Sequence, residues 1–127
     1  MRETIFTKNA PAPIGPYSQA VRFGNTYYFS GQIALDPQTG AFVSETDVKL
    51  QTQQVMKNIQ SLLTESGLSF DNIVKTSIFL KSMNDFPLVN EEYAKYFKDG
   101  IYPARETVEV SRLPKDALVE ISVICAK

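Results

Sequence analysis

The sequence predicts an α+β fold in which two helices cover one face of a mixed sheet of about six strands. Short segments rich in β-branched residues that alternate or run apolar, typical of strands, occur near both ends of the chain and in its second half. Two further segments repeat apolar residues at helical spacing. With 127 residues, the chain is expected to form a single domain, residues 1–127, around one core.

The first part of the chain is expected to contain three short strands and a long helix. The predicted strands are Thr4 to Phe6, Gln19 to Phe23 and Thr26 to Ser30, with Gly24-Asn25 as a tight hairpin turn. Residues 36–40 read as a turn or loop. Apolar residues then recur at helical spacing, which predicts a helix from Asp47 to Ser66 with Gly67 as its C-cap.

The second part is expected to add one helix and three strands. The predicted strands are Ile73 to Lys81, Glu106 to Val110 and Leu118 to Cys125. Phe86, Val89, Tyr93, Tyr96 and Phe97 fall on one face of the second helix, whose N-cap is Asn84 or Asp85. Because two helices cannot cover both faces of such a sheet, we expect its other face to be covered by association with another chain.

Two charged residues interrupt the strand-like sequence near the C-terminus. Arg105 stands at the start of one predicted strand, and Glu120 lies within the last one. Such charges are costly to desolvate unless each meets a partner, which can be a side chain, water or a ligand. One interpretation is a site for a small anion, with Arg105 as a two-pronged carboxylate clamp and Glu120 as a proton-handling group. The other is an Arg–Glu ion pair that joins two strands.

The composition excludes several kinds of chemistry. The chain has no histidine and one cysteine, Cys125, so a Ser-His-Asp or Cys-His site, a usual zinc site and an internal disulfide are all excluded. Cys125 is expected to pack within its strand. The acidic residues are scattered and the glycines lack phosphate-loop spacing, so no metal site or nucleotide cradle is expected.

Charge and the N-terminal segment restrict the expected partners and location. A net charge of −1 and a pI near 5.4 argue against binding of nucleic acid, which needs clustered Lys and Arg. The segment from Met1 to Phe6 carries an acid and no long apolar run, so neither a signal peptide nor a membrane anchor is expected. A reducing cytoplasm is the expected location.

Short motifs follow one another through nearly the whole chain. They are Gly15-Pro16-Tyr17-Ser18-Gln19-Ala20, Ser30-Gly31-Gln32, Asn58, Val74-Lys75-Thr76, Asn84-Asp85-Phe86 with Val89-Asn90, Pro103-Ala104-Arg105, and Leu113-Pro114-Lys115-Asp116 with Glu120-Ile121. In this order and spacing they resemble the Rid (YjgF) family, and in particular its RidA-type imine deaminases. The resemblance implies a chorismate-mutase-like fold and a homotrimer around a central β-barrel, with ligand clefts between neighbouring subunits.

The resemblance also implies a reaction and the residues that carry it. In that family the arginine matching Arg105 binds the substrate carboxylate, and the glutamate matching Glu120 positions or activates water. The positions of Tyr17, Ser30-Gly31 and Thr107 lie at the cleft, with position 107 acting through its backbone. The implied reaction is hydrolysis of 2-imino acids or their enamines, such as 2-iminobutanoate and 2-iminopropanoate, to 2-oxo acids and ammonia, without a cofactor.

Several alternatives stay open at this stage. Tyr17 also fits an interface aromatic residue, and Ser30 also fits a residue that ends its strand. Many family members have cysteine where this chain has Thr107, so a role for a thiol is not implied here. The resemblance to the family is also compatible with a non-enzymatic function, in which a trimeric protein binds a 2-oxo acid and regulates a partner. The preferred imino acid side chain does not follow from the sequence.

Overall fold

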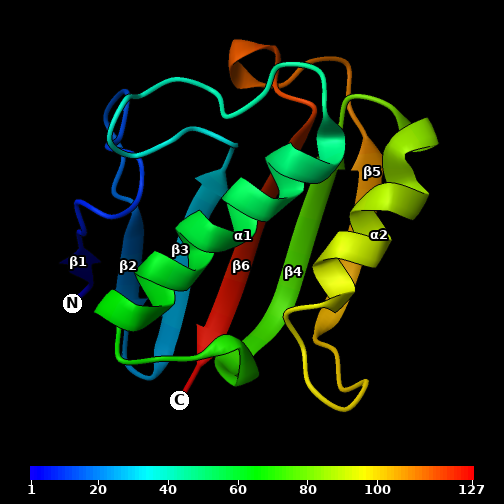
Figure 1. Cartoon of the computed structure of the whole chain (residues 1–127). Helices are drawn as coiled ribbons and strands as arrows, with labels where there is room; N and C mark the ends of the chain where they lie inside the picture. Colours follow the sequence, from blue (N-terminus) through cyan, green and yellow to red (C-terminus); the bar gives the residue numbers. More distant parts are fainter.

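A computed structural model describes all 127 residues and confirms the expected layers, a six-stranded mixed sheet with both helices on one face (Figure 1). The strands are β1 (Glu3–Ile5), β2 (Ala20–Phe23), β3 (Thr26–Gln32), β4 (Ile73–Leu80), β5 (Ala104–Glu109) and β6 (Val119–Ala126). The helices are α1 (Val48–Glu65) and α2 (Phe86–Ala94), and 3₁₀ turns form at η1 (Phe70–Asn72), η2 (Met83–Asp85) and η3 (Pro114–Asp116). Neither α-helix has the length and apolar character that crossing a bilayer requires.

The strand order in the sheet is β1-β2-β3-β6-β4-β5, so the last strand of the chain lies between two earlier ones. Only β4 and β5 pair in parallel, and every other neighbouring pair is antiparallel. This order places Glu120 of β6 near the middle of the sheet and Arg105 on β5, a strand with one free edge.

The core lies between the sheet and the helices. Alternate residues of β6 are buried, which is the pattern of a strand with one face against a core. They are Val119, Ile121, Val123 and Cys125, and they share one cluster with Val55, Met56, Ile59, Leu62 and Leu63 of α1. Burying each such side chain stabilises the fold by about 1.5–3 kcal/mol, so this contact holds α1 against the strand that carries Glu120.

Helix α1 begins and ends close to the predicted positions. The Asp47 carboxylate accepts hydrogen bonds from the N–H groups of Lys49 and Leu50 at 2.9 and 3.1 Å, which satisfies two donors of the first turn. The C-cap is Ser66, one residue earlier than predicted, and Gly67 follows it with φ +71°. A left-handed residue just past the helix end favours glycine, which explains why the sequence signal lay there.

Three elements differ from the predictions in ways that affect the site. Strand β3 continues to Gln32 through a bulge, so Ser30 does not end it. Strand β5 begins at Ala104, which places Arg105 inside the strand. Helix α2 ends at Ala94, and Tyr96 and Phe97 lie beyond it. Every other helix and strand boundary matches its prediction or differs from it by one residue.

Aromatic packing accounts for the early end of α2. The rings of Tyr96 and Phe97 lie 5.4 and 5.8 Å from the ring of Phe70, measured between centroids. This contact draws the chain over η1 instead of continuing the helix, and Asp99 and Gly100 then turn it with φ of 57° and 67°. Tertiary packing thus overrides the helical spacing of these residues.

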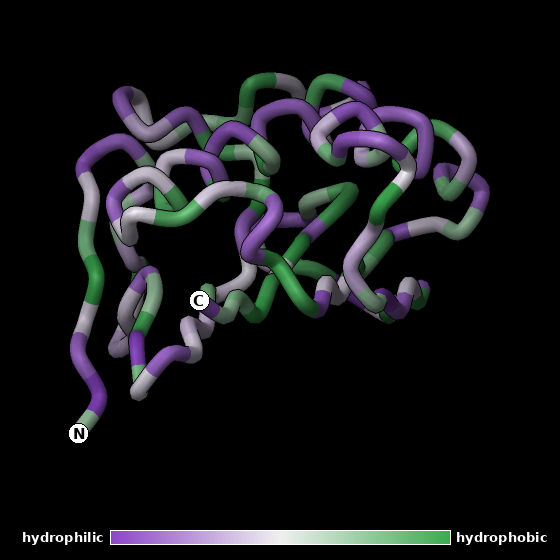
Figure 2. The backbone as a smooth tube through the Cα atoms, turned by 90° about the horizontal axis from the view of Figure 1, so that it is seen from below, coloured by the Kyte–Doolittle hydropathy of each residue, from purple (hydrophilic) through white to green (hydrophobic).

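The other face of the sheet carries no helix, as Figure 2 shows from below. Tyr28 and Val108 lie on this face with 48% and 44% of their surface exposed, and Phe79 and Ile124 are only partly buried. The face agrees with the sequence-based expectation of an uncovered sheet surface. Its cover by another chain stays a prediction.

Candidate functional site

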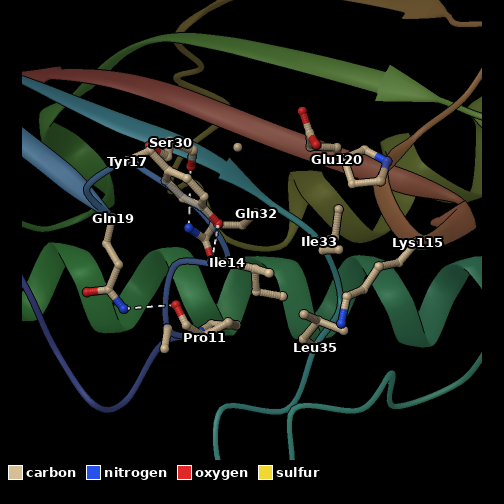
Figure 3. A pocket seen from close by; sticks show the side chains of 13 residues that line it. Pro11, Ile14, Tyr17, Gln19, Ser30, Gln32, Ile33, Leu35, Lys115 and Glu120 are labelled. Carbon is tan, nitrogen blue, oxygen red and sulfur yellow. Dashed lines mark hydrogen bonds between the residues drawn. The ribbon is translucent and has the colours of Figure 1, made fainter.

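A hollow of about 470 Å³ opens beside Glu120, and we call it the Glu120 hollow (Figure 3). It is lined by Pro11, Ala12, Ile14, Tyr17, Gln19, Ser30, Gly31, Gln32, Ile33, Leu35, Pro114, Lys115 and Glu120. Four predicted site residues, Tyr17, Ser30, Gly31 and Glu120, therefore lie together although they are far apart in the chain. Five of its 13 lining residues are hydrophobic, and the lining combines them with polar and charged side chains, as small-molecule sites do.

Glu120 reaches this hollow without a partner in the chain. Its carboxylate takes part in none of the three ion pairs and in no hydrogen bond. It lies against Gly31 of the neighbouring strand, so closely that a β-carbon at position 31 would be 2.6 Å from Oε2 and 2.7 Å from Cδ. Burial raises the pKa of Glu120 above its ordinary value. The site thus holds a carboxyl group whose proton affinity is increased.

Gln19 holds the N-terminal wall of the hollow in place. Gln19 is buried, with only 2% of its surface exposed. Its Nε2 donates to the carbonyl groups of Thr7, Ala10 and Pro11 at 3.0, 3.2 and 2.9 Å, and its Oε1 accepts from the Thr7 N–H at 2.8 Å. One buried amide therefore satisfies backbone groups that no secondary structure pairs. The motif containing Gln19 marked this position, but its role was not predicted.

Tyr17 and Ser30 present their hydroxyl groups differently. The backbone turns at Gly15, with φ +135°, and the Tyr17 hydroxyl oxygen accepts a hydrogen bond from the Ile14 N–H at 3.3 Å. The phenol proton stays free to donate. The Ser30 Oγ donates to the carbonyl of Ser18 at 2.6 Å, so Ser30 can offer a ligand only an acceptor.

Lys115 lines the side of the hollow opposite Tyr17, as Figure 3 shows. Lys115 and Asp116 both adopt left-handed backbone conformations, with φ of 54° and 58°, which residues other than glycine rarely take. The Asp116 carboxylate pairs with Lys81 Nζ at 3.0 Å and ties this strained turn to the end of β4. Lys115 was not predicted as a site residue, because a left-handed lysine has no sequence signal.

Arg105 lies elsewhere in the chain, on the opposite face of the sheet from Glu120. Arg105 is paired in register with Thr76 of β4, and Glu120 with Phe79 of β4. Because residues three apart on a strand point to opposite faces, the two charges do too. Neither forms an ion pair with the other. The interpretation of an Arg–Glu pair joining two strands is therefore wrong.

A second hollow, of about 360 Å³, surrounds Arg105, and we call it the Arg105 hollow. It is lined by Asn90, Tyr93, Ala94, Tyr102, Pro103 and Arg105. Arg105 Nη1 donates to Asn90 Oδ1 at 2.8 Å, and its guanidinium carbon lies 5.6 Å from the ring of Phe86 and 5.4 Å from that of Tyr93. Phe86, Asn90 and Tyr93 share one face of α2, and this i, i+4, i+7 spacing is the signal that could have identified Asn90.

Thr107 lies two residues beyond Arg105 on the same face of β5. Its Oγ1 is buried and has no hydrogen-bond partner. The Val110 N–H donates to the Leu80 carbonyl at 2.9 Å, so by alternation the backbone groups of positions 105, 107 and 109 point to the free edge of β5. The backbone of Thr107 is thus open to a ligand or another chain.

Cys125 is fully buried in the core, and burial raises the pKa of its thiol to about 12. A thiol that does not ionise near neutral pH is not a nucleophile, which agrees with the predicted packing role. No group of three or more His, Cys, Asp or Glu side chains is arranged to hold a metal ion.

Comparison with known proteins relates this geometry to a family. Residues 7–127 match the family model described as Endoribonuclease L-PSP. A RutC family protein of Sulfurisphaera tokodaii is 55% identical over 125 residues, which are 98% of each chain. The 2-iminobutanoate/2-iminopropanoate deaminase of Salmonella typhimurium is 46% identical, over 100% of this chain and 99% of that protein.

A solved structure extends the likeness to the fold. The crystal structure of YyfA from Yersinia pestis, a protein of unknown function in the Rid family, superposes with a TM-score of 0.96. The two are 53% identical, and the match covers 100% of both chains. Sequence motifs, strand order and these comparisons agree, and this chain belongs to the Rid (YjgF) family.

Proposed function

We propose that the protein hydrolyses 2-imino acids, such as 2-iminobutanoate and 2-iminopropanoate, to 2-oxo acids and ammonia, at sites built by two copies of the chain in a homotrimer. In each site the Arg105 hollow of one copy faces the Glu120 hollow of the next. The relative named as an imine deaminase supports the reaction. The observation that carries the proposal is the unpaired Glu120 carboxyl group, set against Gly31 in a small-molecule hollow.

The separation of the two charges within one chain is the reason for a second copy. Arg105 and Glu120 lie two strands apart and three register positions apart, which is roughly 14 Å across the sheet at ordinary strand spacings, and they point to opposite faces. In a 2-imino acid the carboxylate and the imine carbon are bonded neighbours. One substrate therefore cannot engage both residues of the same chain.

The surfaces of the chain support this arrangement. The open sheet face and the free edge of β5 both need cover, and the two hollows are different surfaces. A contact between two different surfaces repeats from copy to copy and closes into a ring when the rotation allows it. A threefold ring gives three equivalent sites, and its sheets form the central barrel that the family resemblance implies.

In the proposed reaction, the Arg105 guanidinium binds the substrate carboxylate through two parallel hydrogen bonds. Glu120 accepts a proton from water as the water oxygen bonds to the carbon of the protonated imine and the π electrons move to nitrogen, forming a neutral carbinolamine. Glu120 then returns this proton to the nitrogen and takes the hydroxyl proton as the carbon–nitrogen bond breaks, so that ammonia leaves and the carbonyl forms. One water is consumed and no redox step occurs. The raised pKa of Glu120 suits this transfer, because a base works best when its pKa approaches the operating pH.

The other residues have narrower proposed roles. The free phenol proton of Tyr17 can donate to the developing amine or to water, and Ser30 can only accept. The outward backbone groups at Thr107 can hold the ligand or the water, which needs no thiol.

Imine decay tests the reaction directly. We generate 2-iminopropanoate in situ with an amino-acid oxidase, in the presence of a competing trap, and compare the wild type with Arg105→Ala and Glu120→Gln. We expect the wild type to clear the imine and both variants to lose about 10²-fold or more in rate. If wild type and variants clear it equally slowly, the enzymatic proposal fails. Binding of 2-oxobutanoate without imine turnover would instead favour the non-enzymatic regulatory alternative.

Mixing the two variants tests the shared site. Arg105→Ala keeps Glu120, and Glu120→Gln keeps Arg105, so a boundary between them can contain one intact pair. After denaturation and joint refolding of equal amounts, about a quarter of the boundaries should be intact if assembly is random. Separately refolded variants are the control. No recovery of activity in the mixture, with trimers confirmed by sedimentation, would refute a site shared between copies.

A further inference from the structure

Arg105 rests on a tyrosine that is itself tied to the strand beside Arg105. The guanidinium carbon lies 5.4 Å from the Tyr93 ring, and the Tyr93 hydroxyl donates to Thr76 Oγ1 at 2.8 Å. Thr76 is the residue of β4 paired in register with Arg105 of β5. Arg105, Tyr93 and Thr76 therefore each contact the other two. Arg105 contacts the Tyr93 ring, Tyr93 is hydrogen-bonded to Thr76, and Thr76 is paired with Arg105 across the two strands.

The hydroxyl groups of Tyr93 and Thr76 are both buried in an apolar core. Tyr93 has 4% of its surface exposed and Thr76 has none. A phenylalanine and a valine would fill the same space with no polar atom to satisfy, whereas a buried hydroxyl needs a hydrogen-bond partner. Each hydroxyl is the partner of the other, so their bond orients the Tyr93 ring rather than serving a contact at the surface.

The oriented ring supports the guanidinium from one side. The face of an aromatic ring carries negative charge density and attracts a cation, more strongly where water is excluded. The ring of Phe97 packs against the ring of Tyr93, with centroids 4.8 Å apart, which limits movement of the Tyr93 ring. Asn90 takes one Arg105 N–H, and no other group of the chain accepts from the guanidinium. The remaining donors are free to face the Arg105 hollow.

We infer that the buried Tyr93–Thr76 pair positions Arg105 for carboxylate binding. The inference rests on the proposed function and adds positioning residues to it. Neither Tyr93 nor Thr76 contacts the reacting atoms. Both act through Arg105, because they fix the orientation of the Tyr93 ring that supports its guanidinium group. The Arg105 side chain therefore loses less conformational entropy when the carboxylate binds.

Affinity for 2-oxobutanoate, measured by calorimetry on the assembled protein, tests the inference. Tyr93→Phe and Thr76→Val each remove the same hydrogen bond while preserving shape, so each should weaken binding by about threefold, and the double variant by no more than either alone. Tyr93→Leu removes the ring and should weaken binding by about tenfold. In imine hydrolysis KM should rise by similar factors while kcat changes less.

Two comparisons separate positioning from a general loss of structure. Tyr96→Phe is the matched control, because Tyr96 packs on Phe70 and does not contact Arg105; it should bind like the wild type. In an Arg105→Ala background, Tyr93→Phe should cause no further loss of affinity. Unchanged affinity in Tyr93→Phe and Thr76→Val, or an additional loss in the Arg105→Ala background, would overturn the inference. If Arg105→Ala itself bound normally, the proposed function would fail instead.

Discussion

Substitution of Gly31 by alanine should separate catalysis from stability. Gly31 does not have a left-handed backbone, so alanine fits its conformation, but the new β-carbon would lie 2.6 Å from Glu120 Oε2 and 2.7 Å from Cδ. These atoms are the mobile end of a side chain, and the carboxyl group can rotate away. A displaced rotamer costs about 0.5–1.5 kcal/mol, and replacing a strand glycine returns a comparable amount. The free energy of unfolding should therefore change by less than about 1 kcal/mol.

The rate of imine hydrolysis should change much more than the free energy of unfolding in Gly31→Ala. Misplacing a catalytic group by about 1 Å costs on the order of 10²-fold, equivalent to about 2.7 kcal/mol of transition-state stabilisation. We expect kcat/KM for 2-iminopropanoate to fall by about 100-fold in Gly31→Ala, with a Tm near that of the wild type. The double variant with Glu120→Gln should be no slower than Glu120→Gln alone, because Gly31 acts through Glu120. A fully active Gly31→Ala protein, or a further loss in the double variant, would refute this reasoning.

Three further predictions concern ionisation and buried polar groups. Burial raises the pKa of Glu120 above its ordinary value of 4.5, so ionisation of its carboxyl group destabilises the fold as pH rises above that value. The difference in Tm between Glu120→Gln and the wild type should therefore grow in favour of the variant between about pH 4 and pH 8. A Tm difference that stays constant with pH would contradict this prediction. With a pKa of about 12, Cys125 should resist iodoacetamide at pH 8 in the native protein, where roughly one thiol in 10⁴ is ionised, and react once unfolded; mass spectrometry would show any native labelling. Thr107→Val removes an unsatisfied hydroxyl and should raise stability by about 1 kcal/mol in denaturant unfolding, whereas a loss would show that the hydroxyl has a partner in the assembled protein.

The layers and most element positions could be predicted because local patterns determine them. The apolar alternation around Ile121 and Val123 gave strand β6, and the helical spacing around Val55 and Ile59 gave α1, each within one residue. Each pattern indicates that one face of a helix or strand is buried, and this holds in almost any arrangement of the elements. Helix α2 was overestimated because the packing of Tyr96 and Phe97 on Phe70 does not depend on helical spacing.

The assembly of the site could be predicted only in part. Motifs marked Tyr17, Ser30, Gly31 and Glu120, and they share a hollow. The position of Arg105 relative to Glu120 depends on the order of the strands. It depends also on which residues of β4 pair with each of the two, because this register decides the face of the sheet to which each side chain points. The spacing in the sequence encodes neither. The support of Arg105 by α2 likewise required knowing which helix face meets β5.

The central place of β6 has a consequence for biosynthesis. Until β6 is available, β1–β3 and β4–β5 have no strand to join them, and the apolar faces of both halves lack their shared neighbour. A nascent chain thus cannot close its sheet before β6 has left the ribosome, so the contacts of β1–β3 and β4–β5 with β6 form later than the contacts within each group. Loss of β6 would leave two separate fragments of sheet, each with an exposed strand edge that favours aggregation.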